Sequence, residues 1–168
     1  MNASGTDSLN VEFVGIRIEV PSNVPMLLFK ETGTNKYLPI SIGMPEATSI
    51  MSVLQNQHLP RPLTHDLFNS FFELAGFEIM QLHISHVDSG TFFAEILIKE
   101  IESAKTYQLS CRPSDGVALA IRSLTEVDVT VSRELFDELC IELDADNAED
   151  EIEQFKSFLD EISPDDFT

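Results

Sequence analysis

Apolar and polar side chains alternate along much of this chain, which is the pattern of strands with one buried face. Residues 11–20 alternate in this way, as expected for a half-buried strand. Two short apolar runs at 26–30 and 36–42 enclose a segment that contains Gly33 and Asn35. This arrangement predicts a β-hairpin.

The middle of the chain shows the same alternation and the same turn signals. Residues 77–87, 91–99 and 105–111 are predicted to be strands, and an Asp-Ser-Gly turn stands before Thr91. A further short strand is expected at 127–131. The chain is therefore rich in strands that follow each other through short connections.

Apolar residues at three- and four-residue spacing predict four helices among these strands. They cover 45–55, 64–75, 114–123 and 132–141. Gly76 follows the second helix in the position where a left-handed residue commonly ends a helix. The expected fold class is α+β, a mostly antiparallel sheet with packed helices. Because three strands followed by a helix occur twice, a duplicated β-β-β-α unit is one interpretation.

Two strand-to-helix corners occupy matching places in the two halves. Pro45-Glu46-Ala47 opens the first helix, and Pro113-Ser114-Asp115 opens the third helix 68 positions later. If a pseudo-twofold relates the halves, Glu46 and Asp115 are expected to come close together.

The two ends of the chain differ from its middle. Residues 1–10 are expected to form a flexible arm, and residues 11–141 the folded domain. Residues 142–168, called the tail below, are expected to form an acidic linker and then an amphipathic helix. Its apolar face either docks on the chain's own core or a dimer mate, or binds a regulatory partner. That face consists of Ile152, Phe155, Phe158, Leu159 and Ile162.

Net charge is the main argument against binding of nucleic acid. The 168-residue chain carries a formal charge of −19 at pH 7, whereas nucleic-acid affinity normally comes from Lys and Arg. Residues 134–168 hold 14 acids and one base, a net −13, which leaves −6 for the rest. A mildly acidic domain can still act on nucleic acid when a divalent metal screens its site. A basic protein partner would suit the tail.

Cysteine use and hydropathy indicate a cytoplasmic protein. Cys111 and Cys140 form no CxxC pair and are expected to be free thiols in a reducing compartment. No apolar run approaches the ~18 residues that a membrane span needs. Residues 1–10 do not have the basic and apolar regions of a signal peptide. No membrane partner is expected.

Residues 61–67 are the first candidate for chemistry. They read Arg-Pro-Leu-Thr-His-Asp-Leu at a predicted helix start, where Thr64 or Asp66 can cap the helix. His65 can exchange a proton near neutral pH, which suits acid–base work or metal ligation. The structural alternative is a capped helix entry with solvated polar side chains.

Residues 111–116 are the second candidate. They read Cys-Arg-Pro-Ser-Asp-Gly, with Pro113 suited to the first helical position and Ser114 or Asp115 able to cap. Free N–H groups at a helix start favour an anion, and Arg112 can add a bidentate contact. The structural alternative is a capping motif in which Arg112 pairs with a carboxylate of the chain.

Taken in order, these motifs resemble one known family. They are Leu-Pro-Ile-Ser-Ile-Gly at 38–43, the segment at 61–67, Gly-Thr-Phe-Phe-Ala at 90–94 and Arg-Pro-Ser-Asp at 112–115. Their order and spacing resemble the bifunctional nuclease domain family, also called the DNase/RNase domain or domain of unknown function 151, over residues 11–135. The resemblance implies a compact α+β domain, frequently a homodimer or larger homo-oligomer, with nuclease activity on RNA and DNA in some members.

Three positions depart from the pattern of that family. Ser110 stands where an acid usually precedes the arginine by two residues, Gly116 replaces an alanine, and Ser41 replaces a bulky residue. An acid at position 110 would be a candidate metal ligand or orienting group. Its absence bears on catalysis more than on the fold.

If the chain hydrolyses phosphodiester bonds, its candidate residues have distinct roles. Carboxylates can hold Mg²⁺ or Mn²⁺, and the metal would activate water and clamp phosphate oxygens. Arginines can hold the phosphate, and His65 can act as general base or acid. The candidate catalytic residues are Arg61, His65, Asp66, Arg112 and Ser114, and the candidate metal ligands are Glu46, Asp66 and Asp115.

A second hypothesis is a non-catalytic homo-oligomeric scaffold or regulatory protein. In this case the charged corners are internal salt bridges that fix two helix starts, and the acidic tail binds a protein partner. Clustering of the candidate residues around one open cleft favours the nuclease, whereas their burial in paired contacts favours the scaffold.

Overall fold

A computed structural model describes residues 7–143, which fold around an eight-stranded sheet. The strand order is β6-β5-β4-β7-β1-β2-β3-β8, and neighbours run antiparallel except for the parallel pair β4 and β7. The expected α+β class with a mostly antiparallel sheet is confirmed. The strands are β1 (Ser8–Glu19), β2 (Val24–Glu31), β3 (Lys36–Ser41), β4 (Phe77–Asp88), β5 (Thr91–Glu100), β6 (Thr106–Cys111), β7 (Asp128–Ser132) and β8 (Ile141–Glu142).

Four helices accompany the sheet in the described part of the chain. None of them combines the length and the hydropathy that crossing a bilayer requires. Gly76, with φ of +75°, follows the second helix in the predicted left-handed position, which glycine adopts without steric cost. The helices are α1 (Met44–Leu54), α2 (Thr64–Leu74), α3 (Pro113–Ala120) and α4 (Arg133–Leu139).

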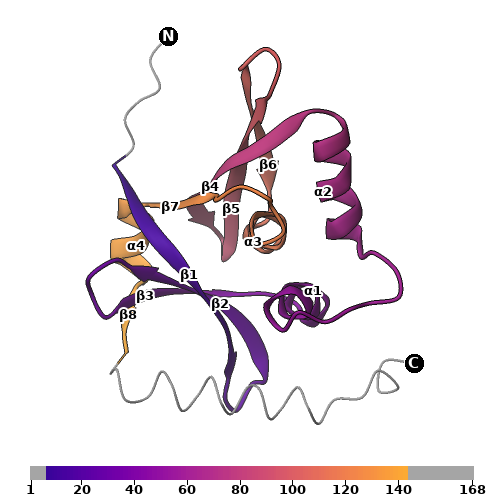
Figure 1. The fold of residues 1–168 in the computed structure, drawn as a ribbon. Helices are drawn as coiled ribbons and strands as arrows, with labels where there is room; N and C mark the ends of the chain where they lie inside the picture. Colours follow the sequence, from indigo (N-terminus) through magenta and orange to yellow (C-terminus); the bar gives the residue numbers. More distant parts are fainter. Residues whose placement is uncertain (1–6, 144–168) are drawn as a thin grey trace.

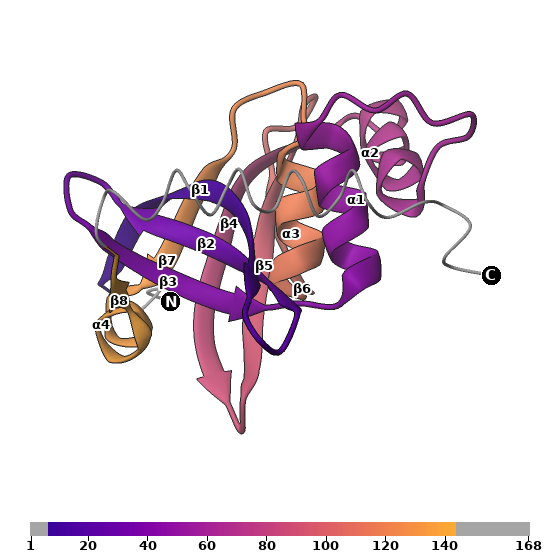
Figure 2. The same cartoon turned by 90° about the horizontal axis from the view of Figure 1, so that it is seen from below.

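The element order repeats, as the sequence predicts. Strands β1, β2 and β3 lead into α1, and β4, β5 and β6 lead into α3. On one side of β7 the strands follow in the order β4, β5, β6, and on its other side in the order β1, β2, β3. This symmetric arrangement is expected for a duplicated unit with a pseudo-twofold. Helices α1 and α3 pack side by side (Figure 2), which brings the two strand-to-helix corners together.

The core lies between the sheet and the layer formed by α1 and α3. Helix α2 lies beside this layer and packs on α3 and β4, whereas α4 lies at the other end of the sheet near β3 (Figure 1). Removal of apolar side chains from water is the main stabilising term, at about 25 cal/mol per Å². The largest fully buried side chains are Leu27, Phe29, Leu38, Ile40, Ile50, Leu82, Ile84, Val117, Val131 and Phe136.

The boundaries differ from expectation at both ends. Strand β1 begins at Ser8, inside the stretch expected to be an arm, because Ser8 pairs with Ser132 and Asp7 forms an ion pair with Arg133. Helix α3 ends at Ala120 instead of residue 123. The two-residue strand β8, which pairs with β3, was not expected. The predicted amphipathic helix of the tail lies outside the described residues.

Candidate functional site

The starts of three helices converge on one open pocket. Residues from the first two turns of α1 and from the start of α2 line it, together with Arg112, the residue before α3. The pocket has a volume of about 510 Å³, within the range of small-molecule sites. Because the positive ends of three helix dipoles point toward it, an anion is favoured there. Its lining residues are Met44, Pro45, Glu46, Thr48, Ser49, Leu63, Thr64, His65 and Arg112.

The N-cap residues of these three helices do not cap their own helix starts. The N-cap residues are Gly43, Leu63 and Arg112, and none of them makes a side-chain cap bond. Of the predicted caps, that by Asp66 is confirmed, because its carboxylate accepts the Leu63 N–H at 2.6 Å. Thr64 is instead the first helical residue of α2, and α3 has no side-chain cap. First-turn N–H groups without a side-chain cap are available to a bound anion.

Arg112 joins the two corners that the duplication was expected to bring together. Its Nε and Nη2 donate to the two carboxylate oxygens of Asp115 at 2.7 and 2.9 Å. Its Nη1 donates to Glu46 Oε1 at 2.7 Å. Gly43 leaves the space for this contact, since a Cβ there would lie 2.4 Å from Glu46 Oε2. The Arg112 side chain is nevertheless 62% exposed, so it faces solvent at the pocket rim.

His65 lies between a carboxylate and a hydroxyl. Its Nε2 is 3.1 Å from Asp115 Oδ1, and its Nδ1 is 2.9 Å from Ser49 Oγ. The Asp115 carboxylate can only accept, so the network assigns a hydrogen to Nε2. In the neutral ring, Nδ1 then accepts the Ser49 hydroxyl hydrogen.

Ser49 and Arg122 belong to the same network, although the sequence analysis missed both. Arg122 Nη2 donates to the Ser49 carbonyl oxygen at 2.9 Å and lies 3.3 Å from Ser49 Oγ, while its Nε donates to Asp66 Oδ1 at 2.6 Å. A continuous chain of contacts thus runs from Glu46 to Asp66. Its members in order are Glu46, Arg112, Asp115, His65, Ser49, Arg122 and Asp66.

The two aspartates of this chain are ionised well below neutral pH. Partial burial alone would raise the pKa of Asp115, but hydrogen bonds from Arg112 and His65 outweigh it and lower the pKa. For Asp66, burial again opposes ionisation, and hydrogen bonds from Arg122 and the Leu63 N–H lower the pKa. Hydrogen bonds to Asp115 and Glu46 raise the pKa of Arg112. These groups therefore hold fixed charges at neutral pH.

Two predicted catalytic residues lie apart from this chain of contacts. Arg61 is exposed, makes no ion pair with residues 7–143 and lines a smaller neighbouring pocket of about 280 Å³ together with Asp66. Ser114 is only 5% exposed and takes part in none of the contacts above. The catalytic roles of Arg61 and Ser114 stay predictions.

The three predicted metal ligands do not form one ligand set. Arg122 and the Leu63 N–H engage Asp66, whereas Arg112 engages Glu46 and Asp115. Across residues 7–143, no group of three or more His, Cys, Asp or Glu side chains is arranged to hold a metal ion. Because these carboxylates already share arginines, the arrangement does not fit a resident metal.

The departure at position 110 does not remove a group from the pocket. Ser110 pairs with Glu95 on β5, while its neighbour Cys111 pairs with the buried Ala94. Side chains alternate between the two faces of a strand, so Ser110 lies on the sheet face away from the core and α3. An acid at this position would stand next to Glu95 instead of His65.

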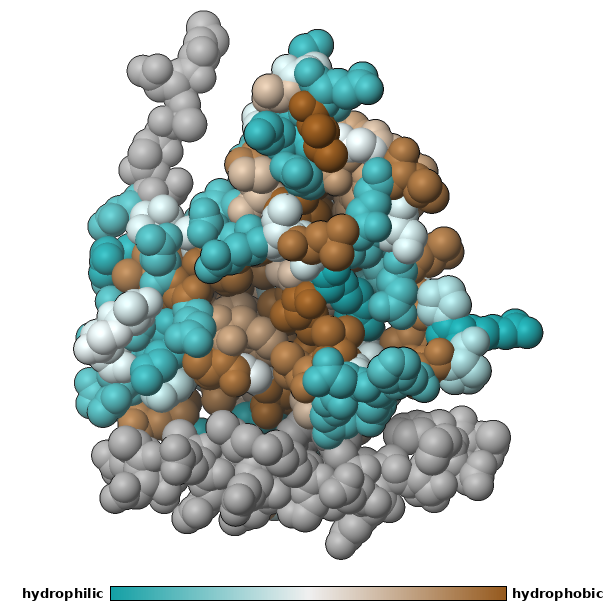
Figure 3. All heavy atoms as spheres, viewed as in Figure 1, coloured by the Kyte–Doolittle hydropathy of each residue, from teal (hydrophilic) through white to brown (hydrophobic). Residues whose placement is uncertain are grey.

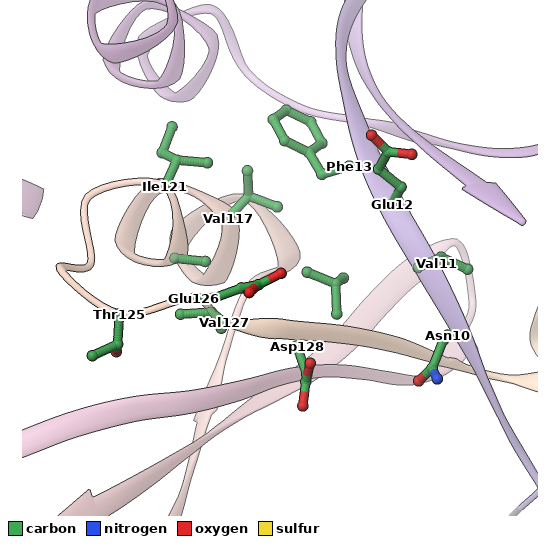
Figure 4. Close-up of a pocket in the computed structure, with 12 residues that line it drawn as sticks. Asn10, Val11, Glu12, Phe13, Val117, Ile121, Thr125, Glu126, Val127 and Asp128 are labelled. Atoms are coloured by element: carbon green, nitrogen blue, oxygen red, sulfur yellow. The ribbon is translucent and has the colours of Figure 1, made fainter. Parts of the chain in front are cut away.

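A second pocket, about 450 Å³ in volume, lies between β1, α3 and β7 (Figure 4). It forms where β1 and β7, paired at residues 8–10, separate. Apolar residues such as Phe13 and Val117 line it together with Glu12, Glu126 and Asp128. No His, Cys, Lys or Arg lines it, so none of the candidate chemistry is located there.

Comparison with known proteins gives consistent matches. A family model described as the bifunctional nuclease domain matches residues 26–144. An uncharacterized protein of Mycobacterium tuberculosis is 39% identical over 94% of this chain and 96% of its own length. Bifunctional nuclease 2 of Oryza sativa is 23% identical over 66% of this chain, and bifunctional nuclease 1 of Arabidopsis thaliana is 22% identical over 62%. The matches cover 35% of the rice protein and 33% of the Arabidopsis protein.

Proposed function

Because the chain belongs to the bifunctional nuclease domain family, we propose that it cleaves phosphodiester bonds of RNA or DNA in the pocket between α1, α2 and α3. The observation that carries the proposal is the convergence of three helix starts on a pocket lined by His65 and Arg112. An anion-binding environment, a cation and an acid–base group are what phosphoryl chemistry needs.

Arg112 is the group we assign to the phosphate. A guanidinium has five N–H donors, and the two carboxylates use three of those on Arg112. Two remain for a phosphate oxygen at the exposed rim, beside the free N–H groups of the helix starts. Glu46 and Asp115 keep the guanidinium in one orientation, so its position is set before the substrate binds.

The charge around this pocket differs from the net charge of the whole chain. Three carboxylates, Glu46, Asp66 and Asp115, are matched by three arginines, Arg61, Arg112 and Arg122, in and around it. The local charge therefore sums to zero, although the chain carries −19. With few cations in contact with phosphates, we expect weak binding with a shallow salt dependence.

The test is cleavage of end-labelled single-stranded RNA and DNA by the wild type, by His65→Ala and by a matched control. His58→Ala is the control, because His58 is exposed in the adjacent loop and, within residues 7–143, its side chain is hydrogen-bonded to the Asn56 carbonyl and not to the network of His65. Loss of the acid–base group is expected to slow cleavage by ~10²–10⁴-fold, with His58→Ala at the wild-type rate. Assays with a chelator and with added Mg²⁺ or Mn²⁺ test the predicted metal separately. Equal cleavage by the wild type and His65→Ala would refute the proposal.

A non-catalytic homo-oligomer is the second candidate, and a specific observation favours it. Helix α2 exposes Leu67, Phe68, Phe71 and Leu74, with Leu74 90% exposed. Apolar side chains gather over α2 at the right-hand edge of Figure 3. Apolar patches of this kind commonly mark contact surfaces. We propose a second copy of the chain as the occupant, as the family resemblance implies.

A further inference from the structure

Both ring nitrogens of His65 are already engaged, and this decides which proton the ring can accept. Nε2 lies against Asp115 Oδ1 at 3.1 Å, and Nδ1 lies against Ser49 Oγ at 2.9 Å. A water molecule would have to displace one of these partners before His65 could deprotonate it. The Ser49 hydroxyl, in contrast, is already in place to give its hydrogen to Nδ1.

We propose that Ser49 is the nucleophile of the reaction, with His65 as its base and Asp115 as the group that orients the ring. This inference rests on the proposed phosphodiester cleavage and assigns its first bond-forming step. A hydroxyl in contact with a base, which a third group orients, is the recurring arrangement of covalent catalysis. It recurs on unrelated folds, so it is identified by geometry and not by chain order.

The position of Ser49 suits this role. It lies on α1, one helical turn after Glu46, and it lines the pocket together with Glu46, His65 and Arg112. The residue is 7% exposed, so its hydroxyl lies at the bottom of the pocket and not on the open surface. A phosphate held by Arg112 at the rim would present its phosphorus toward this hydroxyl.

Arg122 adds a positive charge on the other side of the hydroxyl. Its Nη2 lies 3.3 Å from Ser49 Oγ and 2.9 Å from the Ser49 carbonyl oxygen. The Arg122 side chain is only 5% exposed, so water screens this charge little. A buried cation beside the oxygen stabilises the negative charge that develops as the proton leaves.

The reaction balances with water as the only other reactant. Ser49 Oγ forms a bond to phosphorus, its hydrogen passes to His65 Nδ1, and the bond from phosphorus to the leaving sugar oxygen breaks. His65 then protonates that oxygen. In the second step water attacks phosphorus and gives a proton to His65. The phosphorus–Oγ bond breaks, and Oγ takes the proton back.

The other nucleophilic side chains near the site are less suited than Ser49 to attack phosphorus. Burial and the nearby Asp115 charge raise the pKa of Cys111 to about 11, so it is a protonated thiol at neutral pH. Ser114 is buried, and the two ring nitrogens of His65 face Ser49 and Asp115 instead. Ser49 is therefore the hydroxyl that the network activates.

The test is labelling with diisopropyl fluorophosphate, followed by peptide mass spectrometry and by cleavage assays on the same preparations. The reagent bonds to an activated serine oxygen and releases fluoride, so it detects the nucleophile without any nucleic acid. Ser52→Ala is the matched control for Ser49→Ala, because Ser52 is one turn further along α1, is equally buried and donates only to the Ser49 carbonyl.

The proposal predicts label on the Ser49 peptide in the wild type and in Ser52→Ala, and none in Ser49→Ala. Labelling of His65→Ala is expected to be slower by ~10²–10⁴-fold. Nucleic-acid cleavage by an unlabelled wild type, with Ser49→Ala at the wild-type rate, would overturn the serine assignment and leave the proposed function intact. Absence of both label and cleavage in the wild type would overturn both.

Discussion

At the residue scale, two arginines hold the pocket, and their surroundings give them different tasks. Arg112 is largely exposed, where ion pairs contribute little to stability, so its bidentate contact with Asp115 serves mainly to set geometry. Arg122 is buried and donates to one carboxylate and two carbonyl oxygens, those of Asp66, Ser49 and Ala118. Hydrogen bonds to a buried charge are worth about 1.5–3 kcal/mol. We therefore assign Arg122 mainly to stability and Arg112 mainly to function.

Ser110→Asp, which restores the acid typical of the family, is expected to leave the cleavage rate unchanged. Position 110 lies on the face of the sheet opposite the pocket and pairs with Glu95. Two like charges across neighbouring strands repel each other, so a stability loss of about 0.2–1 kcal/mol is expected. Cleavage assays and urea unfolding measure the two effects. A higher rate in the variant would place position 110 in the site.

Gly116→Ala, which restores the alanine typical of the family, is expected to destabilise the fold by about 1–3 kcal/mol. A Cβ at this position would lie 2.4 Å from Leu82 Cδ1, and Leu82 is fully buried. Leu82→Val should relieve part of the clash. Urea unfolding of both single variants and the double variant measures this coupling. Simple additivity of the two losses would contradict the predicted contact.

Among the elements, hydrogen bonds from one residue beyond α3 hold α1, α2 and α3 together at the site. Arg122, just beyond α3, contacts Ser49 of α1 and Asp66 of α2, and Asn69 of α2 donates to the Arg122 carbonyl oxygen at 2.7 Å. These hydrogen bonds explain why α2, whose main contact with the sheet is to β4, still presents His65 to Asp115.

Asp66→Ala is therefore expected to lower stability by about 1.5–3 kcal/mol, because it removes the carboxylate partner of a buried arginine. Cleavage should fall as α2 loses its anchor, and Asp66→Asn should retain more of both properties. Glu73→Ala is the control, since Glu73 is an exposed acid near the other end of α2. Thermal unfolding and cleavage are measured on the same samples. Full stability in Asp66→Ala would contradict the anchoring role.

Most elements could be predicted from the sequence because each buries one face in the core, and this burial sets the spacing of its apolar residues. The alternation in β1 and the helical spacing in α1 each report one buried face, so their positions agree to within a few residues. Strand β8 has only two residues, too few for any period to show. Helix α3 ends early because the Arg122 and Ser123 N–H groups bond carbonyls three residues back, while the Arg122 guanidinium donates to the Ala118 carbonyl.

The site was less predictable, for a physical reason. Glu46, His65, Arg112 and Asp115 carry recognisable chemistry at helix starts, and the structure brings them together. Ser49 looks like an ordinary polar residue in α1 until His65, 16 positions later, is folded against it. The one available signal for Arg122 was a lone cation directly after the apolar run of α3, where burial would demand partners.

At the scale of the whole molecule, acidic side chains dominate the charge, but those at the site are paired. Asp66 and Asp115 keep their partners only while ionised, and both have a lowered pKa in the folded chain. Their contribution to the free energy of unfolding is therefore fully present above the unfolded-state pKa of about 4. It is lost as the pH falls through the lower pKa values of the folded state.

We expect the free energy of unfolding to drop as the pH is lowered below about 4. Asp115→Asn should show a shallower drop, because one of the two linked groups is gone. Asp128→Asn is the control, since Asp128 is exposed and makes no ion pair within residues 7–143. Urea unfolding between neutral and acidic pH measures the slopes. Identical slopes for the wild type and Asp115→Asn would contradict the linkage.

The exposed face of α2 makes a prediction about assembly. Replacement of Phe71 and Leu74 by serine should lower the average mass in sedimentation experiments if a second copy covers this face. Ile141→Ser serves as control, because Ile141 is an exposed apolar residue on β8. No change in mass with the α2 variant would remove this face as the interface.

We propose that the pocket between the three helix starts performs phosphodiester chemistry through His65. Hydrolysis of bis(4-nitrophenyl) phosphate tests it most directly, because this small diester needs no nucleic-acid groove and releases a coloured product. We predict hydrolysis by the wild type and a rate ~10²–10⁴-fold lower for a folded His65→Ala variant purified in parallel. Equal rates for the two proteins, or no hydrolysis by the wild type, would contradict it.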